Sequence, residues 1–191
     1  MTDNESDGKK PLEVISFTTD VCEESVSRLL TYVSEALNRR ADSLVLMLSS
    51  SGGDLPAAFT AYNFLVSIPL AVTTYNIGNI ESSSNLIFLA GSRRVASPTS
   101  QFMLHGISSP ANSFTRSEIN AQGDRLELDI NRYAEVFRAR TGDCTARLEI
   151  ELCLSGNTRY LSAREACEAG IVNSPDNGVL IPEGALWRNV C

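Results

Sequence analysis

The feature that most constrains the fold is a regular alternation of short apolar runs with helical patterns, joined by Gly/Ser-rich turns. Residues 44–48 (LVLML) form a continuous apolar run typical of a strand covered on both faces. Gly52-Gly53 follows this run and precedes a helical pattern, and such alternation predicts an α/β fold with largely parallel strands. The expected strands are residues 12–17, 44–48, 71–75, 95–96 and 102–104, and the expected helices are residues 23–37, 55–66, 83–90 and 115–140, with a turn at Gly78.

The last of these helices is long. Thr115 and Glu118 form a capping box at its start, and Thr141-Gly142 provides its stop. At 1.5 Å per residue it would be roughly 38 Å long, which is more than a domain of this size can cover. It is therefore either a core-packed helix with a frayed start or a projecting arm that pairs with another subunit. One apolar stripe runs along it, made of Leu126, Ile130, Tyr133 and Phe137.

Composition limits the class of protein. The 191 residues, 43% of them hydrophobic, are enough for one domain with a buried core. The net charge of −7 argues against a nucleic-acid partner, and the Arg93-Arg94 doublet is expected to be a solvated turn. No apolar run approaches the roughly 18 residues that a membrane span needs, so no membrane partner is expected.

The N-terminal residues and the cysteines indicate the compartment. Residues 1–11 are expected to be a flexible polar tail without the apolar core of a secretory signal, which predicts a cytoplasmic protein. The five cysteines are an odd number without C-x-x-C spacing, so they are expected to be free thiols and not a zinc site.

Few side chains in this chain can act as a base near neutral pH. His105 is the single histidine, and the two lysines, Lys9 and Lys10, both lie in the N-terminal tail. Ser82 follows a predicted strand and opens a predicted helix, where backbone N–H groups favour a developing negative charge. The plain alternatives are that Ser82 or a neighbouring serine only caps the helix, that Gly52-Gly53 is a tight turn, and that His105 is structural.

Five segments together resemble the proteolytic subunit of Clp protease, ClpP, as a divergent branch of that family. They are LMLSSSGGD (46–54), TTYNIGNIESS (73–83), LAGSRRVASP (89–98), FMLH (102–105) and LSAREACEAGIV (161–172). The resemblance covers about residues 14–172 and implies the ClpP/crotonase-type fold, an α/β fold of repeated β-β-α units with a projecting handle helix. It implies one serine peptidase domain over residues 12–191, with the handle at about 115–140.

The resemblance also implies a role for each site residue. Ser82 would be the nucleophile and His105 its base, and the backbone N–H groups of Gly53 and Ser83 would form the oxyanion hole. The protein would be a serine-type endopeptidase that cleaves peptides or unfolded proteins through an acyl-enzyme, with no cofactor and no metal. It would form a homo-oligomer of stacked rings, served by an ATPase unfoldase.

The third member of the catalytic group stays open. Counting from the LSA motif puts the family's acid position at Thr158, and counting from Thr141-Gly142 puts it at Ser155. Neither is a carboxylate, so Asn157 could orient the histidine as an amide, or Glu149 or Glu151 could be displaced into place. Two other functions are therefore weighed: a ClpP-like structural or regulatory subunit with weak or no catalysis, and a crotonase-like acyl-CoA enzyme.

Overall fold

A computed structural model describes residues 12–108, 115–142, 148–174, 179 and 181–191. The N-terminal tail expected over residues 1–11 lies outside the described residues. The described residues form a seven-stranded sheet in the order β6-β5-β3-β2-β1-β7, with β4 also paired to β3. The strands are β1 (Leu12–Phe17), β2 (Ser43–Ser50), β3 (Ala71–Glu81), β4 (Arg93–Ala96), β5 (Gln101–Leu104), β6 (Arg159–Ser162) and β7 (Leu186–Val190).

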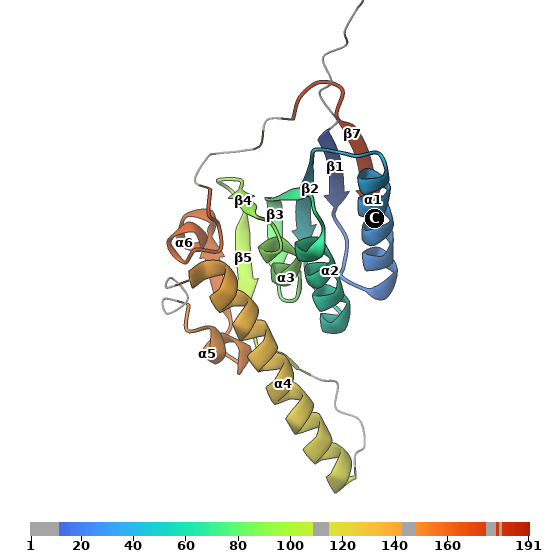
Figure 1. Cartoon of the computed structure of the whole chain (residues 1–191). Coiled ribbons are helices and arrows are strands. Elements are labelled where there is room, and N and C mark those ends of the chain that lie inside the picture. Colours follow the sequence, from blue (N-terminus) through green and yellow to red (C-terminus); the bar gives the residue numbers. More distant parts are fainter. Residues whose placement is uncertain (1–11, 109–114, 143–147, 175–178, 180) are drawn as a thin grey trace, which may run out of the picture.

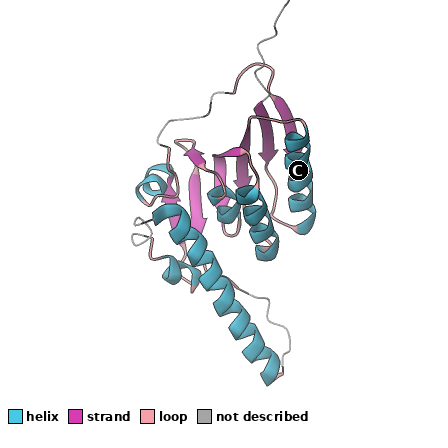
Figure 2. Cartoon of the chain, in the orientation of Figure 1, coloured by secondary structure: helices cyan, strands magenta, loops and turns pink. Residues whose placement is uncertain are grey.

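Helices α1, α2 and α3 cover the sheet, α6 packs against β5 and β6, and α5 packs against α4 (Figure 1). The first three of these helices lie side by side, and the first half of α4 projects away from the body (Figures 1 and 2). The helices are α1 (Glu23–Asn38), α2 (Leu55–Ser67), α3 (Ser84–Leu89), α4 (Arg116–Thr141), α5 (Ile150–Leu154) and α6 (Ala163–Glu168). In the part of the chain that the structure describes, no helix is long and apolar enough to cross a membrane.

The sequence patterns account for most of these elements. The run in β2 buries Leu44, Leu46 and Leu48 completely, and β2 pairs in parallel with both β1 and β3. The capping box of Thr115 and Glu118 is present at the start of α4, and Gly142 follows its end with a φ of 59°. The expected strands and helices in the first three quarters of the chain are confirmed, and α5, α6, β6 and β7 are additions that the patterns did not predict.

The turn expected at Gly78 is wrong, because β3 continues through it to Glu81. The pairing of β2 with β3 passes from Leu48↔Asn76 to Ser50↔Ile80, so β3 carries a bulge opposite Ser49. A Cβ atom on Gly78 would lie 2.6 Å from the Ser49 hydroxyl oxygen. The glycine therefore permits the close approach of two strands and does not reverse the chain.

The expectation of a solvated turn at Arg93-Arg94 is also wrong. Both residues belong to β4, and Arg94 is buried. Its guanidinium donates hydrogen bonds to the carbonyl oxygens of Gly91, Arg140, Gly170 and Ile171. Burial lowers the pKa of Arg94 to about 10, and these acceptors replace the water that the cation gives up. One arginine thus ties the ends of α3, α4 and α6 together.

Candidate functional site

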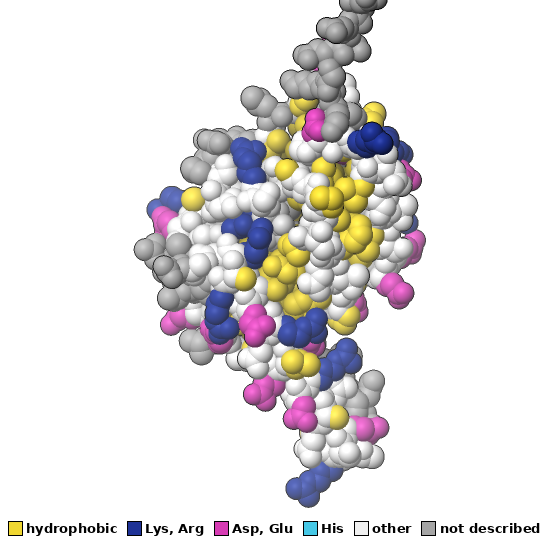
Figure 3. All heavy atoms as spheres, viewed as in Figure 1, with side chains coloured by type: hydrophobic (Ala, Val, Ile, Leu, Met, Phe, Trp, Pro, Cys, Tyr) yellow, Lys and Arg dark blue, Asp and Glu magenta, His cyan; other side chains and the backbone are white. Residues whose placement is uncertain are grey.

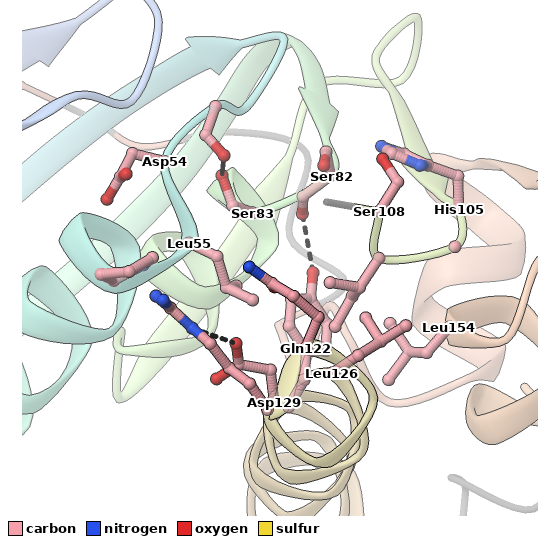
Figure 4. Close-up of a pocket in the computed structure, with 16 residues that line it drawn as sticks. Asp54, Leu55, Ser82, Ser83, His105, Ser108, Gln122, Leu126, Asp129 and Leu154 are labelled. Carbon is pink, nitrogen blue, oxygen red and sulfur yellow. Dashed lines mark hydrogen bonds and ion pairs between the residues drawn. The ribbon is translucent and has the colours of Figure 1, made fainter. Parts of the chain in front are cut away.

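Ser82 is the single residue between the end of β3 and Ser83, the N-cap of α3. Its φ is 53°, a left-handed conformation that costs a serine about 1–3 kcal/mol and needs support from its surroundings. Its N–H donates to the carbonyl oxygen of Met103 in β5 (2.9 Å), which fixes one side of the turn. The sharp strand-to-helix turn directs the Ser82 side chain away from the helix axis and into a pocket (Figure 4).

The hydroxyl of Ser82 is not a helix cap. The N-cap of α3 is Ser83, and no side chain caps this helix. The Ser84 hydroxyl is used inside the fold, where it donates to the carbonyl oxygens of Ser50 (3.1 Å) and Glu81 (2.6 Å). Among the described residues the Ser82 Oγ has no hydrogen-bond partner, so it is free to meet a ligand in the pocket.

Gly53 lines the pocket next to Ser82, and Gly52 precedes it in the same loop. The φ angles of Gly52 and Gly53 are 90° and 139°, which side chains rarely allow, and a Cβ on Gly52 would lie 2.6 Å from the Ser82 Cβ. The carbonyl of Gly52 accepts from Val21 N–H (2.7 Å). Since C=O and N–H point to opposite sides of a trans peptide, this bond turns the Gly53 N–H away from Val21. The glycine pair is therefore a loop pressed against Ser82 and not a simple turn.

Two backbone donors flank Ser82. In the described part of the chain, the N–H groups of Gly53 and Ser83 donate to no acceptor, although Ser83 is buried. The Ser83 hydroxyl donates to the carbonyl oxygen of Gly53 (3.1 Å), so the two donor-bearing segments are tied together. Buried N–H groups are almost always paired, and an unpaired one beside a free hydroxyl is suited to bind an oxygen atom of a ligand.

His105 reaches the same pocket from β5. This strand pairs in parallel with the end of β3, with Met103 opposite Glu81, so His105 and Ser82 leave the sheet at the same edge. Both line a pocket of about 420 Å³ together with Gly53 and Ser83 (Figure 4). The four residues singled out in the sequence for the nucleophile, the base and the oxyanion hole are thus brought together. Among the described residues the imidazole of His105 has no hydrogen-bond partner.

Helix α4 closes the pocket opposite Ser82. Leu126 and Tyr133 line it from this helix, and Leu154 lines it from α5. The pocket also contains two carboxylates, and each is engaged elsewhere. Asp54 accepts from the Ala57 N–H as the N-cap of α2 (2.6 Å), and Asp129 pairs with Arg132 (3.1 Å).

The candidates for a third member lie beside His105 without touching it. Asn157 and Thr158 are exposed, between α5 and β6, and neither lines the pocket. Their segment is nevertheless close, because the N–H of Ile107 donates to the Leu154 carbonyl (3.0 Å) and Gly106 packs against Gly156.

The two displaced glutamates are not brought to the histidine. Glu151 forms an ion pair with Arg138, and Glu149 is the exposed N-cap of α5 with a φ of 47°. Neither lines the pocket. The described residues therefore offer His105 no carboxylate partner.

The sequence patterns did not assign two residues to the site. Tyr133 stood out only as part of the apolar stripe of α4, yet its hydroxyl donates to the carbonyl oxygen of Ser82 (2.7 Å). Asn85 in α3 is completely buried and donates to the same oxygen (2.9 Å). No local pattern distinguishes these side chains, since their partners come from other elements.

Comparisons with known proteins agree with one another. The model of the Clp protease family matches residues 13–174. The ATP-dependent Clp protease proteolytic subunit 2 of Thermobifida fusca is 27% identical over 164 residues, covering 82% of this chain and 77% of the relative. The proteolytic subunit 1 of Leifsonia xyli is 26% identical over 165 residues, covering 84% and 79%. The structure of a ClpP1 point mutant from Listeria monocytogenes has the same fold, with a TM-score of 0.74 at 20% identity over 87% of this chain and 92% of that chain.

Proposed function

Because this chain belongs to the Clp protease family, we propose that it is a serine-type endopeptidase with Ser82 as nucleophile and His105 as general base. The observation that carries the proposal is the composition of one pocket. It combines the Ser82 hydroxyl, the His105 imidazole and the N–H groups of Gly53 and Ser83, none of which has a hydrogen-bond partner among the described residues. These are the groups that acyl transfer requires.

The chemistry follows from this arrangement. The Ser82 Oγ attacks the carbonyl carbon of the peptide bond while His105 takes its proton. The tetrahedral oxyanion then accepts hydrogen bonds from the Gly53 and Ser83 N–H groups. When the C–N bond breaks, the protonated His105 gives its proton to the leaving amine. Water, activated by the same base, then hydrolyses the ester to the free acid and restores Ser82.

The first test uses Ser82→Ala and His105→Ala. Each variant is expected to lose cleavage of a fluorogenic peptide by about a thousandfold or more, because each removes one member of a group that acts as a unit. Labelling by a fluorophosphonate probe, which reacts with an activated serine hydroxyl, should disappear in both. Ser84→Ala is the matched control for Ser82→Ala, since the Ser84 hydroxyl is bonded inside the fold.

Within the described segments no carboxylate pairs with His105, and this favours a second candidate function, a ClpP-like subunit with weak or no catalysis. Without a charged partner the imidazolium formed in the reaction is less stabilised. No probe labelling of Ser82 in the assembled wild-type protein would contradict the peptidase and leave this second function.

We propose further that the protein assembles into stacked rings through α4, receives peptides or unfolded proteins, and works with an ATPase unfoldase. The projecting half of α4 supports assembly, since it exposes Ile119 (57%) and Leu128 (58%) to solvent. The names of the relatives from Thermobifida fusca and Leifsonia xyli, which include "ATP-dependent", support the ATPase. A cytoplasmic location stays a prediction from the sequence.

A further inference from the structure

The carbonyl oxygen of Ser82 is held by three donors. The Tyr133 hydroxyl donates to it from α4 (2.7 Å), the Asn85 side-chain amide donates from α3 (2.9 Å), and the Asn85 backbone N–H donates as part of the helical turn (3.2 Å). The first of these bonds is the dashed line that reaches Ser82 in Figure 4. The start of a helix uses only the bond from the backbone N–H to this oxygen. The Tyr133 and Asn85 side chains therefore add bonds that the helix itself does not need.

Holding this oxygen determines the direction of the next N–H group. The peptide unit between Ser82 and Ser83 is planar, and its C=O and N–H point to opposite sides. When Tyr133 and Asn85 draw the Ser82 carbonyl toward α4 and α3, the Ser83 N–H must point the other way. The Gly52 carbonyl, held by Val21, orients the Gly53 N–H in the same manner. The directions of the Ser83 and Gly53 N–H groups are thus set by the hydrogen bonds of the carbonyl in the same peptide unit.

Asn85 also connects this peptide to β5. Its side-chain amide donates a second bond to the carbonyl oxygen of Met103 (3.0 Å), the atom that also accepts from the Ser82 N–H. The Asn85 Oδ1 is buried and has no hydrogen-bond partner in the described part of the chain. A buried unsatisfied oxygen costs free energy, and this orientation is the one that lets the NH₂ group serve two carbonyls.

Tyr133 is fixed independently of its hydroxyl. Its ring stacks on Phe137 with centroids 5.3 Å apart and meets the edge of Phe59 at 6.5 Å. Burial raises the pKa of Tyr133, while the neighbouring Asn85 amide acts in the opposite direction. The net rise keeps the phenol protonated at neutral pH, so that its hydroxyl remains a donor.

From this geometry we propose that Tyr133 and Asn85 are positioning residues, which hold the 82–83 peptide so that the Ser83 N–H faces the oxyanion. They would also support the left-handed φ of Ser82. In this role the two residues act through the 82–83 peptide and not through a bond to the substrate. The inference rests on the proposed peptidase function, because it assigns the source of the oxyanion geometry at the same site.

The test is Tyr133→Phe, which removes the hydroxyl and keeps the ring. We expect kcat for a fluorogenic peptide to fall about fivefold, the equivalent of one hydrogen bond, while KM changes less than about twofold. The oxyanion forms only in the transition state, so its donors affect kcat and not substrate binding. Tyr32→Phe in α1 is the matched control: its ring lies beneath Arg188, and kcat should be unchanged.

Asn85→Ala provides a second test of the positioning role. It should lower kcat and the rate of fluorophosphonate labelling of Ser82 more than Tyr133→Phe, because it removes the bonds to two carbonyls. In the double variant the loss should be smaller than the product of the two single losses, since both side chains bond to one oxygen. Thermal unfolding of each variant separates this role from a structural one, which would lower the melting temperature and leave kcat of the folded protein intact.

The outcomes distinguish this inference from the proposed function. If the wild type labels and cleaves while both single variants keep the wild-type kcat, the positioning role is overturned and the peptidase stands. A rise in KM with kcat unchanged would overturn it equally. If the wild type is neither labelled nor active, the peptidase function and this inference fail together.

Discussion

His105 stands at the end of β5, where antiparallel pairing with β6 decides which residue lies across from it. The ladder ends where Leu104 pairs with Arg159, and the same register extended by one residue would set His105 opposite Thr158. A threonine hydroxyl can accept a hydrogen bond from an imidazole, but it carries no charge to stabilise an imidazolium. The register thus supports Thr158 over Asn157 and Ser155 as the residue at the acid position.

Thr158→Asp is therefore expected to raise kcat, by about tenfold or more, because a carboxylate opposite His105 would stabilise the positive charge that forms on it. Peptide cleavage at saturating substrate measures the effect. Asn157→Asp is the matched control, and it should change kcat little. An increase in the Asn157 variant alone would move the third position to residue 157.

Among the elements, α4 is divided into two halves with different tasks. Its second half buries Tyr133, Ala134 and Phe137 against the core, whereas its first turns are exposed. The exposed start depends on local bonds: the Thr115 hydroxyl accepts from the Glu118 N–H, and the Glu118 carboxylate accepts from the Thr115 N–H. These bonds lower the pKa of Glu118 from its ordinary value near 4.5.

Thr115→Ala is expected to accelerate amide hydrogen exchange in the first turn of α4 and to leave exchange in the core strands unchanged. A carboxyl group with a lowered pKa stabilises the folded turn above its ordinary pKa, and this contribution is lost as the pH falls through the lowered value. The difference between variant and wild type should therefore shrink in acid. Thr31→Ala, which removes a hydroxyl bonded to Ser27 within α1, should not change exchange in α4.

Across the whole molecule, apolar side chains gather in two places, the buried core and one groove on the surface. The core includes Phe17 in β1 and Val190 in β7, which are paired in register because β7 runs parallel to β1. On the face in Figure 3 apolar side chains gather between α1 and α2, where Val26, Leu30 and Phe64 line a groove. The projecting half of α4 is mostly polar and carries isolated apolar residues.

If α4 joins subunits as proposed, the double variant Ile119→Glu/Leu128→Glu should have a lower native mass than the wild type at equal concentration. Both side chains are more than half exposed, so charge at these positions should leave the fold of the subunit intact, as circular dichroism would verify. Val66→Glu on α2 places the same charge on a side chain that is 44% exposed, and it serves as the control. An unchanged mass in the α4 variant would contradict assembly through this helix.

The sequence alone determined the elements whose causes are local, and it supplied the candidate residues of the site. Apolar runs, the Thr115 capping box and the Gly142 stop depend on neighbours within a few residues, and a single histidine left one candidate base. Tertiary structure decided what depends on distant partners. Gly78 continues a strand because Ser49 of β2 lies beside it, and β7 exists because β1 is there to pair with it. The carbonyl of Ser82 is held by Tyr133 and Asn85 because the fold brings α4 and α3 to that turn, a contact that no spacing along the chain encodes.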